Sequence, residues 1–255
     1  MPTAALLRLQ IERSLERRFP AALSPAAHVV ETAPTGIEKV DDLLHGGLAV
    51  GAITEIAGTE STGRTNLALA FLAHLTGEGR SCAWIDADDA LDPESAAASG
   101  VVLHQLLWVR CRSNAAQVKS KPWLRLEQAI RAADLLLQAG GFAAIVLDLA
   151  GTAPEHARRI PLATWFRFRQ AAARTRCSLV VLGQSAYALS SAAAVLECAT
   201  LTASDRGEAV LDGFTFSVRH SPLRPGIAAS PATGMRKPPA SAWPADCPWN
   251  TEKRA

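Results

Sequence analysis

The chain has 255 residues, of which 49% are hydrophobic, and its formal net charge is +2. This length and apolar content are enough to bury one sizeable core, so we expect one domain with extensions. The charge balance neither requires nor excludes nucleic acid, because the basic residues are mostly arginine and are unevenly placed along the chain.

The cysteines and the N-terminal segment indicate where the chain resides. The cysteines are odd in number, widely scattered and without C-x-x-C spacing, which fits reduced thiols better than a disulfide framework or a zinc site. The N-terminus mixes leucines with charged residues, so it excludes a signal peptide or a membrane span. We therefore expect a cytoplasmic protein with no membrane partner. The cysteines are Cys82, Cys111, Cys177, Cys198 and Cys247.

The two ends of the chain differ from its middle. Residues 4–18 predict an amphipathic helix whose apolar stripe packs either on the core or on a partner. We expect residues 1–29 to form this helix and a linker, and residues 30–220 to form the core domain. Residues 221–255 are rich in proline and show little periodicity, which argues against a packed element. This segment is expected to be a disordered tail.

Apolar runs and helical periodicity alternate along the core. Continuous apolar strands that alternate with helices are typical of a parallel sheet covered on both faces. The predicted fold class is therefore α/β, with a mostly parallel central β-sheet flanked by helices on both faces. Helices are predicted over residues 38–44, 65–75, 92–98, 123–139 and 162–174, and strands over 51–57, 82–86, 106–111, 143–148, 178–184, 199–203 and 214–218.

One segment between a predicted strand and a predicted helix has the layout of a phosphate-binding loop. Its glycines can adopt positive φ, which lets successive backbone N–H groups turn toward an anion at the N-terminus of a helix. The strand, loop and helix follow one another in the required order. A glycine-rich turn without a ligand is the alternative. The predicted nucleotide-binding residues of the loop are Gly58, Thr59, Glu60, Ser61, Thr62, Gly63, Arg64 and Thr65.

Two residues at the end of this loop carry its chemistry. Thr65 stands where a hydroxyl ligates Mg²⁺, and Arg64 stands where a lysine contacts the β and γ phosphates. Arginine is bulkier and planar, and it cannot occupy the space of the lysine unless the ligand or the side chain moves. We expect ATP and Mg²⁺ binding to be weakened or lost, and hydrolysis to suffer more than binding.

A carboxylate closes the apolar run of residues 143–148. Asp148 would be costly there unless it lies at the C-terminal edge of the sheet, where α/β proteins bind ligands. We expect it to hold Mg²⁺ through water. The alternative is an aspartate that caps the next turn.

Taken in order, these motifs resemble the RecA family of recombinases over about residues 30–220. The resemblance starts at Thr35-Gly36-Ile37, includes the phosphate loop, and continues through the run from Trp84 to Pro93. It implies a RecA-like P-loop core with ATP and Mg²⁺ as cofactors. It also implies that Asp92 belongs to the nucleotide site, that Asp88 takes the catalytic position, and that Gln184 senses the γ-phosphate.

The departures from that family are equally informative. The family has lysine in place of Arg64, glutamate in place of Asp88, and an aromatic ring that stacks on adenine in place of Ser95. Both DNA-binding loops of the family are shortened here, and a proline-rich tail takes the place of its C-terminal domain. All of these departures weaken recombinase chemistry.

With these eroded motifs, its size and its composition, the chain resembles the ImuA group of RecA-like proteins. That resemblance implies an accessory role in SOS-induced mutagenic translesion DNA synthesis. The implied partners are RecA, an ImuB-type inactive relative of the Y-family polymerases, and an error-prone polymerase. The RecA resemblance also suggests self-association through the N-terminal helix. An active DNA-dependent ATPase that filaments on single-stranded DNA remains the alternative.

A basic segment with interleaved aromatic residues is the candidate for DNA contact. Arginines could meet phosphates while Trp165, Phe166 and Phe168 stack on bases. The alternative is a solvated helix face whose aromatic stripe lies in the core. The candidate DNA-binding residues are Arg158, Arg159, Arg167, Arg169, Arg174 and Arg176.

Overall fold

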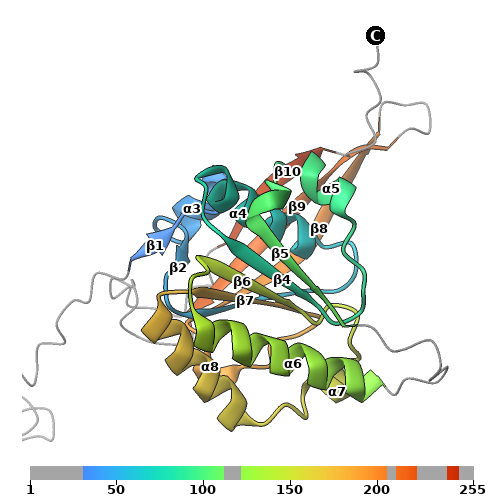
Figure 1. Cartoon of the computed structure of the whole chain (residues 1–255). Coiled ribbons are helices and arrows are strands. Elements are labelled where there is room, and N and C mark those ends of the chain that lie inside the picture. The colour runs from blue at the N-terminus through green and yellow to red at the C-terminus, as the bar shows by residue number, and fades with distance from the viewer. Residues whose placement is uncertain (1–30, 112–121, 206–210, 223–239, 247–255) are drawn as a thin grey trace, which may run out of the picture.

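The structure, a computed structural model, describes residues 31–111, 122–205, 211–222 and 240–246 (Figure 1). The predicted N-terminal helix of residues 4–18 lies outside these ranges. Among the described residues, no helix combines the length and apolar character needed to cross a membrane.

The described residues form one eight-stranded sheet with the order β10-β9-β8-β3-β7-β6-β4-β5. Six neighbouring strands, from β8 to β5, run parallel, and β9 and β10 add an antiparallel extension at the other edge. The prediction of a mostly parallel sheet is confirmed. The strands are β3 Ile53–Ala57, β4 Cys82–Asp86, β5 Leu106–Arg110, β6 Ala144–Asp148, β7 Ser178–Gly183, β8 Ala194–Asp205, β9 Leu211–Pro222 and β10 Ala240–Asp246.

Helices cover both faces of this sheet, as the sequence predicts. Each face encloses a separate hydrophobic cluster, one centred on Phe71 and Trp84 and the other on Trp165 and Phe168. A small sheet of β1 (Thr32–Ala33) and β2 (Leu48–Ala49) precedes the main one. The first cluster packs under α3 Glu38–Leu43, α4 Arg64–Gly77 and α5 Pro93–Ala98, and the second under α6 Pro122–Ala139, α7 Pro154–Ala157 and α8 Leu162–Thr175 (Figure 1).

The four central strands are buried along their whole length, which explains their continuous apolar sequences. Every residue of β3, β4, β6 and β7 is buried, because helices lie on both sides of the sheet. The polar exceptions therefore stand out. Asp86 and Asp148 end β4 and β6 directly opposite each other, and Glu55 lies in the middle of β3. The first two mark the C-terminal edge of the sheet as the place for a polar site.

The C-terminal segment differs from its prediction. β9 continues to Pro222, and β10 lies within the segment that we expected to contain no packed element. The open edge of β9 offers backbone N–H and C=O groups that an added strand satisfies whatever its composition. β10 lies at the edge of the sheet, where a proline such as Pro244 costs no hydrogen bond if its nitrogen points away from β9.

The cysteines that the structure describes are free thiols. Cys82, Cys111, Cys177 and Cys198 are all buried. Burial raises the pKa of Cys82 to about 11 and that of Cys198 to about 12. Such thiols are poor nucleophiles at neutral pH, so we assign them to packing.

Candidate functional site

The predicted phosphate loop connects β3 to α4. Gly63 has φ +82° and directly precedes the first residue of α4, and Ser61 also has a positive φ of 58°. Inside the loop, the Thr62 hydroxyl donates to the Thr59 carbonyl at 2.7 Å. The loop is tied to the next strand, because the Gly58 N–H donates to the Gly183 carbonyl at 3.1 Å. The loop thus stands at the N-terminus of a 14-residue helix.

Strands β8 and β9 pack closely against this loop. A Cβ atom on Gly58 would lie 2.7 Å from the Cys198 carbonyl oxygen, and one on Gly63 would lie 2.6 Å from the ring of Phe216. The Thr200 hydroxyl donates to the Ser61 carbonyl. Glycine is therefore required at both positions because neighbouring atoms leave no room for a Cβ atom. At Gly63 it is also required by the positive φ.

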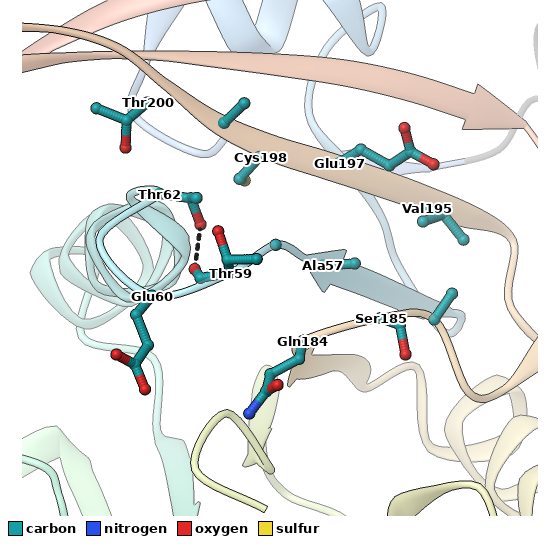
Figure 2. Close-up of a pocket in the computed structure, with 13 residues that line it drawn as sticks. Ala57, Thr59, Glu60, Thr62, Gln184, Ser185, Val195, Glu197, Cys198 and Thr200 are labelled. Carbon is teal, nitrogen blue, oxygen red and sulfur yellow. Dashed lines mark hydrogen bonds between the residues drawn. The ribbon is translucent and has the colours of Figure 1, made fainter. Parts of the chain in front are cut away.

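Two cavities flank the phosphate loop. The larger, of about 690 Å³, lies between the loop, the Gln184–Ala186 segment and β8, which passes across the loop in Figure 2. The Gln184 amide donates to the Ala150 carbonyl at 3.3 Å, which links the ends of β7 and β6. The carboxylates of this cavity are Glu60 and Glu197. The charged side chains that line it are therefore all acidic.

The smaller cavity, of about 290 Å³, brings together most of the other predicted site residues. It lies between α4, α5 and the ends of β4 and β6. This grouping joins the two predicted Mg²⁺ ligands to the residues that the family resemblance placed around the nucleotide. The residues concerned are Thr65, Asp88, Asp92, Ser95 and Asp148.

Asp148 is the most perturbed carboxyl group of the site. Burial, together with the neighbouring carboxylates Asp86 and Asp88, raises its pKa to about 6. The N–H of Ala150, which donates to Asp148 Oδ1 at 2.9 Å, and the charge of Arg64 act in the opposite direction. A desolvated carboxyl group with this surplus of negative charge around it is suited to a cation.

The sequence analysis did not identify Asp86 as part of this site. It is buried, and its oxygens accept hydrogen bonds from the Ala90 N–H at 3.0 Å, the Leu91 N–H at 2.9 Å and the Trp108 indole N–H at 3.2 Å. These bonds shape the turn that carries Asp88. The same strand-end pattern that identified Asp148 could have identified Asp86.

Asp88 lies against the segment that follows β6. The Thr152 hydroxyl donates to Asp88 Oδ2 at 3.3 Å, and Arg125 of α6 lies 3.9 Å from Oδ1. A Cβ atom on Gly151 would lie 2.8 Å from the same carboxylate. The side chain that we expected at the catalytic position thus contacts Thr152 and Arg125 of the protein itself. Sequence reasoning did not identify Arg125 or Thr152.

Asp92 serves as the N-cap of α5. It accepts hydrogen bonds from the Glu94 N–H at 3.3 Å, the Ser95 N–H at 3.0 Å and the Ser95 hydroxyl at 2.5 Å. The hydroxyl bond from Ser95 lowers the pKa of Asp92 most. Ser95, which stands where the family has an aromatic ring, therefore turns back to the cap.

Arg64 is buried although it carries a charge. Its side chain is part of a residue that is only 7% exposed, and its Nη1 has no hydrogen-bond partner among the described residues. It lies close enough to Asp148 to lower the pKa of that carboxyl group. A buried, unpaired guanidinium nitrogen is costly, and an anion at the loop would relieve that cost.

The candidate DNA-binding arginines do not form one array. Arg158 and Arg159 are exposed after α7. On α8, Arg167 donates to Asp134 of α6 at 2.9 Å, and Arg174 donates to Gln138. The remaining two are Arg176, which pairs with Glu31, and Arg169, which lies 4.8 Å from the ring centre of Phe166.

The aromatic residues of α8 divide between the core and the surface. Trp165 and Phe168 are fully buried and meet edge to face at 5.9 Å. Phe166 is exposed. Only Phe166 could therefore stack on a base without a change in the core.

Comparison with known proteins identifies similar sequences. Residues 9–157 match the RecA N-terminal domain family. The chain is 37% identical to Protein RecA of Rickettsia massiliae over 141 residues, which are 54% of this chain and 38% of that protein. It is 43% identical to Protein RecA of Gloeothece citriformis over 99 residues, 38% of this chain and 28% of that protein. The matched region thus spans less than two fifths of these relatives.

The two ends of α4 give a matched test of the loop geometry. Gly63→Ala should destabilise the fold by about 2 kcal/mol or more, because it adds both a positive-φ penalty and a clash with Phe216. Gly77→Ala, where an added Cβ meets nothing within 4 Å, should be neutral or stabilise by up to about 1 kcal/mol. Urea unfolding of both variants measures the difference, and equal effects would contradict the loop geometry.

Asp148→Asn should stabilise the fold at neutral pH. The folded-state pKa is raised, so the carboxyl group contributes its full stability only below pH 3.8, and that contribution is lost as the pH rises through about 6. Asparagine keeps the acceptor for the Ala150 N–H and removes the charge, so we expect a gain of about 2 to 3 kcal/mol at pH 7.

Thermal unfolding of Asp148→Asn between pH 4 and pH 8 tests this expectation. The stabilities of variant and wild type should converge near pH 4. Asp92→Asn is the control, because the pKa of Asp92 is lowered and its substitution should give no gain at pH 7. A constant difference across the pH range would contradict the buried charge of Asp148.

Proposed function

The chain belongs to the RecA N-terminal domain family, and on that basis we propose that it is a RecA-like DNA repair accessory protein. In this proposal, it acts in SOS-induced mutagenic translesion DNA synthesis in the cytoplasm. Its partners are RecA, an ImuB-type inactive relative of the Y-family polymerases, and an error-prone polymerase. It binds ATP and Mg²⁺ weakly and turns ATP over little. The relatives named Protein RecA support the DNA repair setting.

The residues at the loop fit a nucleotide phosphate and a Mg²⁺ ion. Gly63 adopts the positive φ that turns the loop into α4, α4 begins directly after it, and Arg64 Nη1 has no hydrogen-bond partner among the described residues. The backbone N–H groups of the loop would hold the phosphates. Thr65 and Asp148, which line one cavity, would hold Mg²⁺, which supplies charge neutralisation when bound.

Weak turnover is inferred mainly from the burial of Arg64. A lysine in this place would extend to the β and γ phosphates, whereas the Arg64 side chain is buried beside Asp148 and lines neither cavity. Its fixed charge lies next to a predicted Mg²⁺ ligand, which disfavours the metal. Asp88 adds to the effect, because Thr152 and Arg125 engage the carboxylate that would have to orient water.

Direct contact with single-stranded DNA is a second part of the proposal. Arg158 and Arg159 are exposed after α7, and Phe166 is exposed beside Arg169 on α8. Exposed arginines and an exposed ring match the needs of phosphate contact and base stacking. Arg167 and Arg174 are less suited, since both are bonded to α6.

Arg64→Lys tests the nucleotide site directly. Lysine can reach the phosphates and frees the space beside Asp148, so we expect Mg-ATP to bind about tenfold more tightly to the variant than to the wild type. Isothermal titration with Mg-ATP measures both, and Arg80→Lys, an exposed arginine outside the site, is the control. Unchanged affinity in Arg64→Lys would contradict our account of the buried arginine.

Paired substitutions test the DNA proposal. Replacing Arg158 and Arg159 by glutamine should lower affinity for a thymidine oligonucleotide and reduce the salt slope by about 1.4, the value for two lost phosphate contacts. Replacing Arg167 and Arg174 should change the slope less, because their side chains contact α6. Fluorescence anisotropy at several salt concentrations gives both slopes. An unchanged slope in the first pair would exclude DNA contact there.

A further inference from the structure

A carboxyl group in the middle of the central sheet is unused by the proposed nucleotide chemistry. Glu55 lies at the third of five residues of β3 and is 1% exposed. Its Oε1 accepts hydrogen bonds from the N–H groups of Tyr187 and Ala188 at 2.5 and 2.9 Å. Its Oε2 has no partner among the described residues. An acid in this position costs folding energy, so stability alone does not account for it.

The bonded N–H groups belong to the segment between β7 and β8, residues 184–193, which we name the wall loop. Its first three residues, Gln184, Ser185 and Ala186, form one wall of the larger cavity beside the phosphate loop. Tyr187 and Ala188 follow immediately. Glu55 therefore accepts hydrogen bonds from the two wall-loop residues that directly follow those lining the cavity.

Several groups of the wall loop are strained or lack hydrogen-bond partners among the described residues. The ring of Tyr187 lies against Gly183, where a Cβ atom would come within 2.5 Å of it. The hydroxyl groups of Ser185, Tyr187 and Ser191 are buried without hydrogen-bond partners among the described residues. Leu189 is 54% exposed with a positive φ of 47°. These features are costly. The backbone bonds that offset them include those from the Ser191 N–H to the Ala188 carbonyl at 2.9 Å and from the Ala193 N–H to the Ile53 carbonyl at 2.8 Å, and they leave the N–H groups of Tyr187 and Ala188 to Glu55.

The same strand that carries Glu55 leads into the phosphate loop. Ala57 ends β3 two residues later, and the N–H of Gly58 bonds to the carbonyl of Gly183, the residue before the wall loop. Both loops therefore start from one pair of hydrogen-bonded strands. A displacement of the phosphate loop can therefore be transmitted to the wall loop through a few residues in direct contact.

We propose that Glu55 is a positioning residue that anchors the wall loop and so sets the shape of the cavity beside the phosphate loop. The role in ligand response rests on the nucleotide binding proposed above, whereas the anchoring does not. The side chain acts through the two N–H groups and touches no ligand. Glutamine in place of Glu55 would keep the acceptor oxygen, and alanine would remove it.

The pKa of Glu55 agrees with this arrangement. Burial raises the pKa of the carboxyl group, and the N–H groups of Tyr187 and Ala188 lower it. The two hydrogen bonds thus offset only part of the free-energy cost of burying the charged carboxylate. Glu55→Gln should accordingly fold at least as stably as the wild type at neutral pH.

Tyr187 provides a single-site probe, because it is the one tyrosine of the chain. Protein labelled with 3-fluorotyrosine should give one ¹⁹F resonance, displaced from that of the free amino acid because the ring is only 5% exposed. Glu55→Gln should keep this resonance. Glu55→Ala should move it toward the free value and broaden it. Thr54→Val, a buried change on the same strand, is the control and should leave it in place.

Addition of Mg²⁺ with a non-hydrolysable ATP analogue tests the response of the wall loop. The resonance should shift in the wild type and in Glu55→Gln, but not in Glu55→Ala. Calorimetry on the same samples separates the two proposals. Binding in all three proteins with equal shifts would overturn the role of Glu55 while nucleotide binding stands. An absence of binding would overturn the nucleotide site, and the ¹⁹F position in Glu55→Ala would still decide the anchoring.

Amide hydrogen exchange in the wild type keeps the inference testable if Glu55→Ala fails to fold. The N–H groups of Tyr187 and Ala188 should exchange as slowly as those of buried β7 residues such as Val181. Exchange of both at the rate of free loop amides would overturn the anchoring by Glu55.

Discussion

The charge of Arg64, buried beside the carboxyl group of Asp148, is the constraint on which the rest of the site depends. A parallel sheet covered on both faces leaves water access mainly at its C-terminal edge, where Asp86, Asp148 and the phosphate loop meet. Negative and positive groups are both desolvated there. An anion at the loop and a cation at Asp148 would complete the balance.

Local sequence pattern was sufficient to predict much of this. The strands that end in the phosphate loop and in Asp148 are continuous apolar runs, and the glycines at positions 58 and 63 stand at the strand and helix boundaries. Such signals come from neighbouring residues, so the mostly parallel sheet and its helices were predicted from them, and Thr65, Asp88 and Asp148 line one cavity. The order of the parallel strands brings these segments together in space.

The contacts that the sequence could not predict join residues far apart in the chain. Nothing near Gly63 indicates that Phe216 of β9 lies against it, and nothing near Asp88 indicates Thr152 or Arg125. The hydrogen bonds of Glu55 to the segment after β7 are of the same kind. β10 was missed because composition predicts the behaviour of an isolated segment, whereas the open edge of β9 supplies its partner.

The phosphate loop thus packs against the β8–β9 pair, and the larger cavity lies between it and the wall loop. In the function that we propose, such a platform binds nucleotide with little catalysis. The most direct test of this central claim measures ATP binding and ATP turnover in one sample of the unmodified chain with Mg²⁺ and single-stranded DNA. Our account predicts saturable binding with turnover no higher than in buffer. DNA-stimulated turnover that Asp148→Ala abolishes would contradict it.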